Sequence, residues 1–385
     1  MNNNHSEVIN KNVAIVPPGG KLLYQDFALN RMCRFFKSHN IITYLVKIKD
    51  TDIVFDSFTD YLIEVDSQED LIVELKSRDF NLIISRSWMH RYSFSAELLE
   101  NFENIIFYIK DWHVELPRDK YKYQYSTDED YDAIKKLFSS KKTILSHYTD
   151  EYTKKTWSKH YNTSENQFKF FPEYCSKDNF FSKTNISYSP EKIKLLYIGI
   201  INATTSMPND LAYGKSFFDS ILNITKQSLN LDIMVLEKNY DRIQKEAIFK
   251  DYLYEDKFNK YFSIVKGSAL NMHKTNDYHF GIFQFLSPID NHQYLRANAF
   301  AVVSKFAYYM EAGLPIIVHE CFSVAKIVEK YKIGIVVKDS EIMKLNDFLN
   351  ISQKDYLSLV ENVYSFRESY SYNVETMRPI LEAIT

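Results

Sequence analysis

Short apolar runs alternate with longer amphipathic segments along this chain, and the alternation occurs in two successive series. In the first series, runs typical of strands occupy residues 13–16, 42–46, 82–85, 105–109 and 143–146. Helical patterns lie near residues 25–38, 69–78, 93–102, 130–139 and 150–160. Strands that alternate with helices need crossover connections, so the pattern predicts a parallel sheet covered by helices.

The second series follows a short strand-like run at 168–171 and an irregular stretch at 172–192, which we interpret as a linker. Its strands are predicted at 194–199, 231–236, 262–267, 279–285, 316–318 and 333–337, and its helices near 214–226, 241–253, 305–312 and 323–331. We therefore predict an α/β chain of two Rossmann-like, doubly wound domains that face each other across a cleft. The predicted domains are 1–178 and 179–366, and a C-terminal helix at 367–385 could pack back on the first.

Charge and composition exclude several classes of protein. The net charge of −3 argues against a general nucleic-acid surface. No apolar stretch reaches the ~18 residues that span a bilayer, and the polar first residues lack a signal-peptide core. Cys33, Cys175 and Cys321 lie far apart and are expected to be reduced packing thiols. We expect a cytoplasmic protein, and leave contact with the inner face of the cell membrane open.

Glycine is scarce, with eight in 385 residues against a usual share of ~7%. Each glycine is therefore a candidate for a backbone position that requires one. Gly19 and Gly20 follow the first strand of the first series, and Gly199 closes the first strand of the second. A ligand can approach the backbone at such turns, although tight turns without a ligand are the alternative. Neither turn matches GxGxxG, which disfavours a dehydrogenase-type dinucleotide site.

The segment SKFAYYMEAGLPIIVHE has a clear helix start and stop. Ser304 is predicted to cap a helix over residues 305–312. Gly313 supplies the left-handed conformation that ends the helix, and Pro315 prevents its continuation. Residues 316–318 form the next strand.

Lys305 stands in the first turn of this helix, where a positive charge opposes the helix macrodipole unless an anion is bound. Backbone amides and an ammonium group at one helix start can hold a phosphate group. The sequence therefore indicates a phosphate site at Lys305, with a solvated surface lysine as the alternative.

The same segment resembles the motif (P)SKxxEYxAAGxPVI in the nucleotide-sugar domain of GT-B-fold glycosyltransferases. The matching residues are Ser304, Lys305, Phe306, Tyr309, Met310, Ala312, Gly313, Leu314, Pro315, Ile316 and Ile317. Other stretches are similar to family motifs in the same order: YIKDWHVELP to DxHxE, PEYCSKDNFF to PNGVDxxxF, KLLYIG to the start of the donor domain, and HFGIFQFLSPIDN to D(I/V)GIxPF.

The resemblance implies transfer of a sugar from a nucleotide donor without a metal ion or further cofactor. Lys305, assisted by helix amides and by the region of Ser323, would neutralise the leaving-group charge. Further donor contacts are expected from Gly199, Asn202, Arg296, Asn298, Ser304, Tyr308, Glu311, His319 and Glu320.

The chain departs from the family at two positions. Many retaining members carry two glutamates eight positions apart, where this chain has Phe300 and Tyr308. Glu311 is a candidate for the ribose contact, with a plain exposed helix glutamate as the alternative. The missing pair leaves retention or inversion of stereochemistry open.

An inverting enzyme needs a general base for the acceptor hydroxyl. The candidates are Asp111, His113 and Glu115, which follow a predicted strand, and Asp26. Acceptor binding is expected from Gly19, Gly20 and Arg86. The acidic run at 128–130 could imitate metal-binding carboxylates, but it follows the polar stretch YQYST, so we predict a solvated helix start and no metal site.

The sequence thus predicts a metal-independent glycosyltransferase that acts on a saccharide, lipid-linked or protein acceptor in bacterial surface glycan synthesis. The alternatives are a nucleotide-sugar epimerase or hydrolase on the same fold, and a catalytically silent assembly subunit. No nucleic-acid partner is expected, and the oligomeric state stays open.

Overall fold

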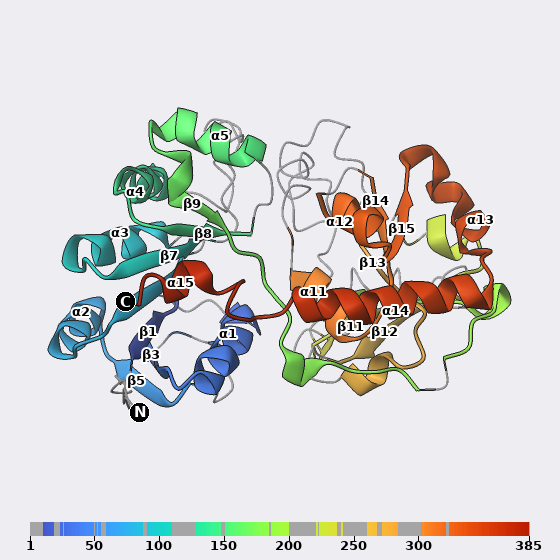
Figure 1. The fold of residues 1–385 in the computed structure, drawn as a ribbon, viewed down its shortest axis with the longest axis horizontal. Helices are drawn as coiled ribbons and strands as arrows, with labels where there is room; N and C mark the ends of the chain where they lie inside the picture. Colours follow the sequence, from blue (N-terminus) through green and yellow to red (C-terminus); the bar gives the residue numbers. More distant parts are fainter. Residues whose placement is uncertain are drawn as a thin grey trace, which may run out of the picture. The chain divides into compact units, whose positions relative to one another are not determined.

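The chain folds into two compact units, seen here in a computed structural model (Figure 1). The structure describes residues 11–18, 24–25, 27–49, 51, 53–54, 59–87, 91–109, 128–147, 151–184, 186–199, 221, 223–236, 240–241, 260–267, 272–283, 302, 304–320 and 323–384. The N-terminal unit comprises Met1–Ser176 and Tyr372–Thr385, and the C-terminal unit comprises Lys177–Ser371.

Seven parallel strands form the sheet of the N-terminal unit, in the order β5-β3-β1-β6-β7-β8-β9. The strands are β1 (Asn12–Val16), β3 (Ile42–Ile48), β5 (Tyr61–Val65), β6 (Leu82–Ser87), β7 (Ile105–Ile109), β8 (Ile144–Ser146) and β9 (Phe168–Phe170). A small separate pair joins β2 (Tyr24–Gln25) to β4 (Ile53–Val54). The helices are α1 (Phe27–Ser38), α2 (Gln68–Ser77), α3 (Tyr92–Asn101), α4 (Asp128–Ser139), α5 (Glu151–Tyr161) and α15 (Arg378–Leu381). Central strands β6 and β7 are buried throughout, as expected for a parallel sheet covered on both faces.

Six parallel strands form the sheet of the C-terminal unit, in the order β12-β11-β10-β13-β14-β15. The strands are β10 (Lys194–Ile198), β11 (Asn230–Val235), β12 (Phe262–Lys266), β13 (Phe280–Ile282), β14 (Ile316–His319) and β15 (Gly334–Val337). Helices with described bounds are α11 (Ser304–Glu311), α12 (Ser323–Tyr331), α13 (Leu345–Leu349) and α14 (Gln353–Ser369). The predicted helices near 214–226 and 241–253 lie mostly outside the described residues.

In each sheet, the first few strands of the chain are added on one side of the first strand, and the later strands are added on its other side. β1 pairs with β3 on one side and with β6 on the other, and β10 pairs in the same way with β11 and β13. This is the doubly wound arrangement, so the prediction of two Rossmann-like α/β domains is confirmed. Ligands of such sheets bind beyond the carboxyl ends of the strands at the point of reversal. A ligand site is therefore expected at the carboxyl end of β10.

Strand β5 is absent from the sequence prediction. It lies at the edge of its sheet, and Tyr61 and Leu62 are 53% and 56% exposed. The ring of Tyr61 stacks on Tyr44 of β3, with 4.7 Å between the centroids. The strand reads YLIEV, so it has an apolar run that the sequence prediction overlooked, although three of its five side chains are exposed.

The stretch at 172–192, predicted to be a linker, is packed against the C-terminal unit over much of its length. The Lys183 amide donates to the Tyr364 hydroxyl at 2.9 Å. The Tyr188 ring stacks on that of Tyr356, with 4.4 Å between centroids, and its hydroxyl donates to the Leu349 carbonyl. The boundary between the two units falls inside this stretch, between Ser176 and Lys177, and the residues after it belong to the layer around α14 instead of forming a free connection.

Lys183 is half-buried within this layer. Its ammonium donates to the Tyr278 carbonyl and, at 3.3 Å, to the Tyr356 hydroxyl. Burial lowers the pKa of Lys183 to about 8, although Asp277 opposes the shift. The folded protein thus releases this proton more easily than the unfolded chain does.

A pH dependence of stability follows from Lys183. Between pH 8 and pH 10.5 the unfolded chain binds more protons, so the free energy of unfolding is expected to rise with pH in this window. The Lys183 contribution to the slope is at most ~1.4 kcal/mol per pH unit. Lys183→Met should remove that contribution. Urea unfolding of both proteins at pH 7.5, 8.5 and 9.5, followed by far-UV circular dichroism, measures the difference, and parallel pH curves would contradict the assignment.

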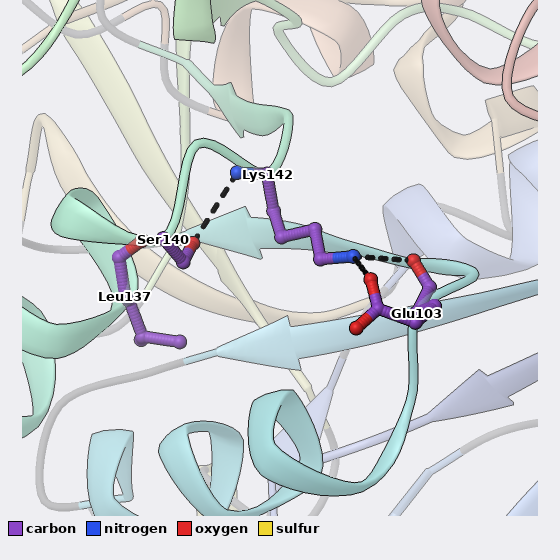
Figure 2. A network of polar contacts seen from close by, with 4 residues as sticks. All are labelled: Glu103, Leu137, Ser140 and Lys142. Carbon is purple, nitrogen blue, oxygen red and sulfur yellow. Dashed lines mark hydrogen bonds and ion pairs between the residues drawn. The ribbon is translucent and has the colours of Figure 1, made fainter.

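A polar network joins the amino ends of β7 and β8 in the N-terminal unit (Figure 2). The Lys142 ammonium donates at 2.6 Å to both the carboxylate and the backbone carbonyl of Glu103. The hydrogen bond and charge of Lys142 lower the pKa of the Glu103 carboxyl. The Lys142 amide also donates to Ser140, whose hydroxyl donates to the Leu137 carbonyl. The network therefore ties two turns together at the edge of the sheet opposite the carboxyl strand ends.

The acidic run at 128–130 begins helix α4, where Asp128 and Glu129 are exposed. Asp130 is only 1% exposed, and its carboxylate accepts the Tyr92 amide at 3.1 Å, in the first turn of α3. The prediction of a solvated helix start is therefore wrong for Asp130. In the described part of the chain, no cluster of three or more His, Cys, Asp or Glu side chains has a metal-site arrangement. No described helix combines the length and apolar character needed to cross a membrane.

Candidate functional site

Gly199 and Lys305 meet where the strand order of the C-terminal sheet reverses. Gly199 follows β10 with φ +152°, and its amide donates to the Met234 carbonyl at 3.2 Å. A Cβ atom at Gly199 would lie 2.8 Å from Lys305 Cε. The positive φ favours glycine here, and any added side chain would also push the end of Lys305 aside. The structure thus brings together two residues that the sequence singled out for separate reasons.

The Lys305 side chain lies over the ring of Tyr197, a residue of β10. Its ammonium nitrogen is 4.5 Å from the ring centroid. Tyr197 is completely buried, whereas Lys305 is half-buried in the first turn of α11. The ring face attracts a cation at this distance. The positive charge is therefore held beside the carboxyl end of β10.

Tyr309 joins α11 to the two strands at the reversal. Its hydroxyl accepts the Ile198 amide at 3.1 Å and donates to the Ile282 carbonyl at 2.7 Å. Its ring occupies the space beside Gly281, where a Cβ atom would lie 2.3 Å from the ring. Complete burial raises the pKa of the Tyr309 hydroxyl well above its usual value, which keeps the hydroxyl as a donor. Helix α11 is thereby tied to the ends of β10 and β13.

The predicted end of helix α11 is confirmed. Gly313 has φ +67°, and its amide donates to the Met310 carbonyl at 3.0 Å. A Cβ atom there would also lie 2.5 Å from the Tyr364 ring. At the other end, the helix begins at Ser304 itself, so the predicted capping position is wrong by one residue. Ser304 belongs to the first turn of the helix.

Glu311 is completely buried, which excludes the alternative of an exposed helix glutamate. Asn179 donates to its carboxylate at 3.2 Å, and the Phe181 amide donates to its backbone carbonyl at 2.9 Å. Tyr308 is also buried, with 8% exposure. The donor contacts predicted for Glu311 and Tyr308 stay predictions. The contacts that Glu311 makes with Asn179 and Phe181 hold α11 against that segment of the chain.

Arg367 of α14 contributes to the same support. Its guanidinium lies between the rings of Phe180 and Tyr364, 4.5 and 4.4 Å from their centroids. It donates to the carbonyls of Phe181, at 2.7 Å, and of Glu311, at 3.3 Å. A single arginine in an amphipathic helix carries no signal for this role, so it could not be predicted from the sequence.

Three predicted donor residues lie at or beyond the carboxyl end of β14, the same edge of the sheet as Gly199. His319 is completely buried, and Glu320 is exposed with its amide bonded to the Val337 carbonyl at 2.9 Å. Ser323 begins α12, and its hydroxyl oxygen is buried with no hydrogen-bond partner among the described residues. Their donor contacts stay predictions.

Arg86 of β6, predicted to bind the acceptor, is 1% exposed. Its guanidinium carbon lies 3.8 Å from the centroid of the Tyr108 ring, and its Nη2 atom lies 3.5 Å from the Glu173 carboxylate. These contacts tie β6 to β7 and to the segment after β9, which favours a structural role. The acceptor contact of Arg86 stays a prediction.

The remaining predicted site residues lie outside the described residues: Gly19, Gly20, Asp26, Asp111, His113, Glu115, Asn202, Arg296 and Asn298. All four candidates for the general base are among them. The contacts of Tyr197 and Tyr309 with the site were not predicted from the sequence. The one signal for Tyr197 is its position two residues before Gly199, since residues at this spacing share a face of a strand.

Part of the C-terminal unit is similar in sequence to known proteins. Residues 248–381 match the family described as Glucosyltransferase 3-like, C-terminal domain. Glucosyltransferase 3 of Streptococcus parasanguinis is 33% identical over 82 residues, which cover 21% of this chain and 24% of that protein. The match thus spans about a quarter of the length of the curated relative.

Solved structures resemble the chain over nearly its whole length. HepE of Anabaena in complex with UDP has a TM-score of 0.61 at 9% identity, over 97% of this chain and 99% of that one. A glycosyltransferase from Rickettsia africae has a TM-score of 0.63 at 10% identity, over 98% of each chain. Sucrose-phosphate synthase of Thermosynechococcus elongatus has a TM-score of 0.64 at 8% identity, over 97% of each chain. The chain therefore has the two-domain, Rossmann-like GT-B fold, with a segment similar to the Glucosyltransferase 3-like C-terminal domain in its second part.

Proposed function

We propose that this protein is a glycosyltransferase that takes a sugar from a nucleotide-sugar donor bound by its C-terminal unit. The observation that carries the proposal is the position of the Lys305 ammonium, beside Gly199 and in the first turn of α11. A helix start with an ammonium group favours an anion such as a diphosphate. The family match, and solved neighbours that hold UDP or UDP-glucose, support the same ligand class.

In this proposal the chemical work of the C-terminal unit is electrostatic. As the bond between sugar and diphosphate breaks, negative charge grows on the leaving phosphate. Lys305 and the first amides of α11 would stabilise that charge, which lowers the barrier more than it stabilises the bound donor. We propose that no metal ion is required, and that the acceptor and its general base lie in the N-terminal unit. The proposed setting is bacterial surface glycan synthesis in the cytoplasm.

Calorimetric titration with UDP, ADP, GDP and CDP tests the ligand class. At least one diphosphate is expected to bind in the presence of EDTA, and more tightly than its nucleoside. Incubation with the corresponding nucleotide sugars and a panel of acceptors then tests the reaction. Binding of no diphosphate would contradict the proposal. Release of sugar without an acceptor would favour a hydrolase, and binding without any turnover would favour a silent subunit.

A further inference from the structure

The proposed function assigns a role to Lys305 but none to the Tyr197 ring that its ammonium contacts. It lies in β10, two residues before Gly199, and is completely buried in the core around the sheet. The Lys305 ammonium lies 4.5 Å from its centroid, and the Lys305 chain passes close to the Cα of Gly199. A rigid ring thus lies under a flexible, charged side chain at the point of strand reversal.

Holding an ammonium group in place has a physical benefit for anion binding. A lysine side chain has four rotatable carbon–carbon bonds, and fixing it on binding costs conformational entropy. A ring that attracts the ammonium beforehand reduces this cost, because less freedom remains to be lost.

We propose that Tyr197 is a positioning residue that holds the Lys305 ammonium in place for the phosphate of the ligand. This inference rests on the proposed function, because it assigns the ammonium to an anionic ligand. Gly199 completes the arrangement, since the absence of a side chain there lets Lys305 lie against the strand end. In this proposal the aromatic ring of Tyr197, and not its hydroxyl group, holds the Lys305 ammonium.

Two variants separate these properties. Tyr197→Phe keeps the ring and is expected to bind the diphosphate chosen from the panel within about twofold of the wild-type affinity. Tyr197→Leu removes the ring, and binding should weaken about 5- to 10-fold. The matching nucleoside, which has no phosphate, should bind both variants like the wild-type protein. Equal losses for nucleoside and diphosphate, or equal losses in the two variants, would overturn the proposal.

A measurement without ligand keeps the inference separate from the proposed function. Reductive methylation with ¹³C-formaldehyde labels lysines, and the Lys305 signal is identified by its absence in Lys305→Met. Ring currents should shift that signal upfield in the wild-type protein and in Tyr197→Phe, and the shift should vanish in Tyr197→Leu or, if that variant does not fold, in Tyr197→Met. An unshifted wild-type signal would exclude the positioning role. A shifted signal in a protein that binds no diphosphate would contradict the proposed function and, with it, the assignment of the held ammonium to a phosphate ligand.

Discussion

Lys305→Met is expected to weaken binding of the diphosphate by about 10- to 100-fold, because a hydrogen bond to a charged group contributes ~1.5–3 kcal/mol. The thermal midpoint without ligand should change little, since Lys305 is only half-buried and methionine fills much of the same volume. Calorimetric titration measures the affinity, and a melting curve checks the fold. If turnover is present, its rate should fall at least as much as affinity does, because charge on the leaving phosphate is greatest in the transition state.

Lys142→Met is the matched control for this variant. Lys142 also lies at the end of a strand, but at the amino edge of the N-terminal sheet, where it contacts the Glu103 carboxylate (Figure 2). The substitution makes the same change of charge and size at a place with no role in the proposed site. Diphosphate affinity should stay at the wild-type value. Equal losses for the two lysine variants would point to a general charge effect and would remove Lys305 from the site.

Gly281→Ala is expected to lower the free energy of unfolding by about 2–3 kcal/mol. The added methyl group would lie 2.3–2.7 Å from three ring atoms of Tyr309. That ring is fully buried and held by two hydrogen bonds through its hydroxyl, so it has little room to move. Urea unfolding measures the loss. The displaced ring should also disturb the end of β10, so diphosphate affinity is expected to fall in the same variant.

Gly267→Ala is the control in the same unit. There the added methyl group would meet the side chain of Met234, 2.6 Å from its sulfur, and a thioether can turn away. Its stability loss should be clearly smaller than that of Gly281→Ala. Combining Gly281→Ala with Tyr309→Leu should give a total loss smaller than the sum of the two single losses, because the smaller side chain relieves the overlap. Simple additivity would show that the overlap is not the cause.

The central strands and most described helices could be predicted from sequence because their signals are local. A run such as 105–109 is apolar throughout because a parallel strand at the centre of a sheet is covered on both faces, and β7 has these same bounds. The predicted helix at 323–331 also matches α12. The packing of 172–192 depends on contacts with distant residues, such as that of Tyr188 with Tyr356, and no local pattern records it.

The candidate site could be predicted in part for a similar reason. Gly199 and Lys305 are each unusual for their place in the sequence. Glycine is scarce in this chain, and a lysine is unfavourable in the first turn of a helix. Nothing in the local sequence is unusual at Tyr197, Tyr309 or Arg367. Aromatic residues are so common in this chain that a tyrosine below a lysine, or an arginine between two rings, becomes visible only when the strands and helices are assembled.

The N-terminal unit contains residues from both ends of the described chain, and this affects the order in which it can form during synthesis. Tyr372 donates its amide to the Cys175 carbonyl and its hydroxyl to the Ala28 carbonyl, at 2.9 and 3.2 Å. The ribosome delivers Ala28 344 residues before Tyr372, and Cys175 almost two hundred residues before it. During synthesis, the part of the N-terminal unit that contacts Tyr372 therefore stays uncovered until the whole of the C-terminal unit has been made. The unit that begins first is the one completed last.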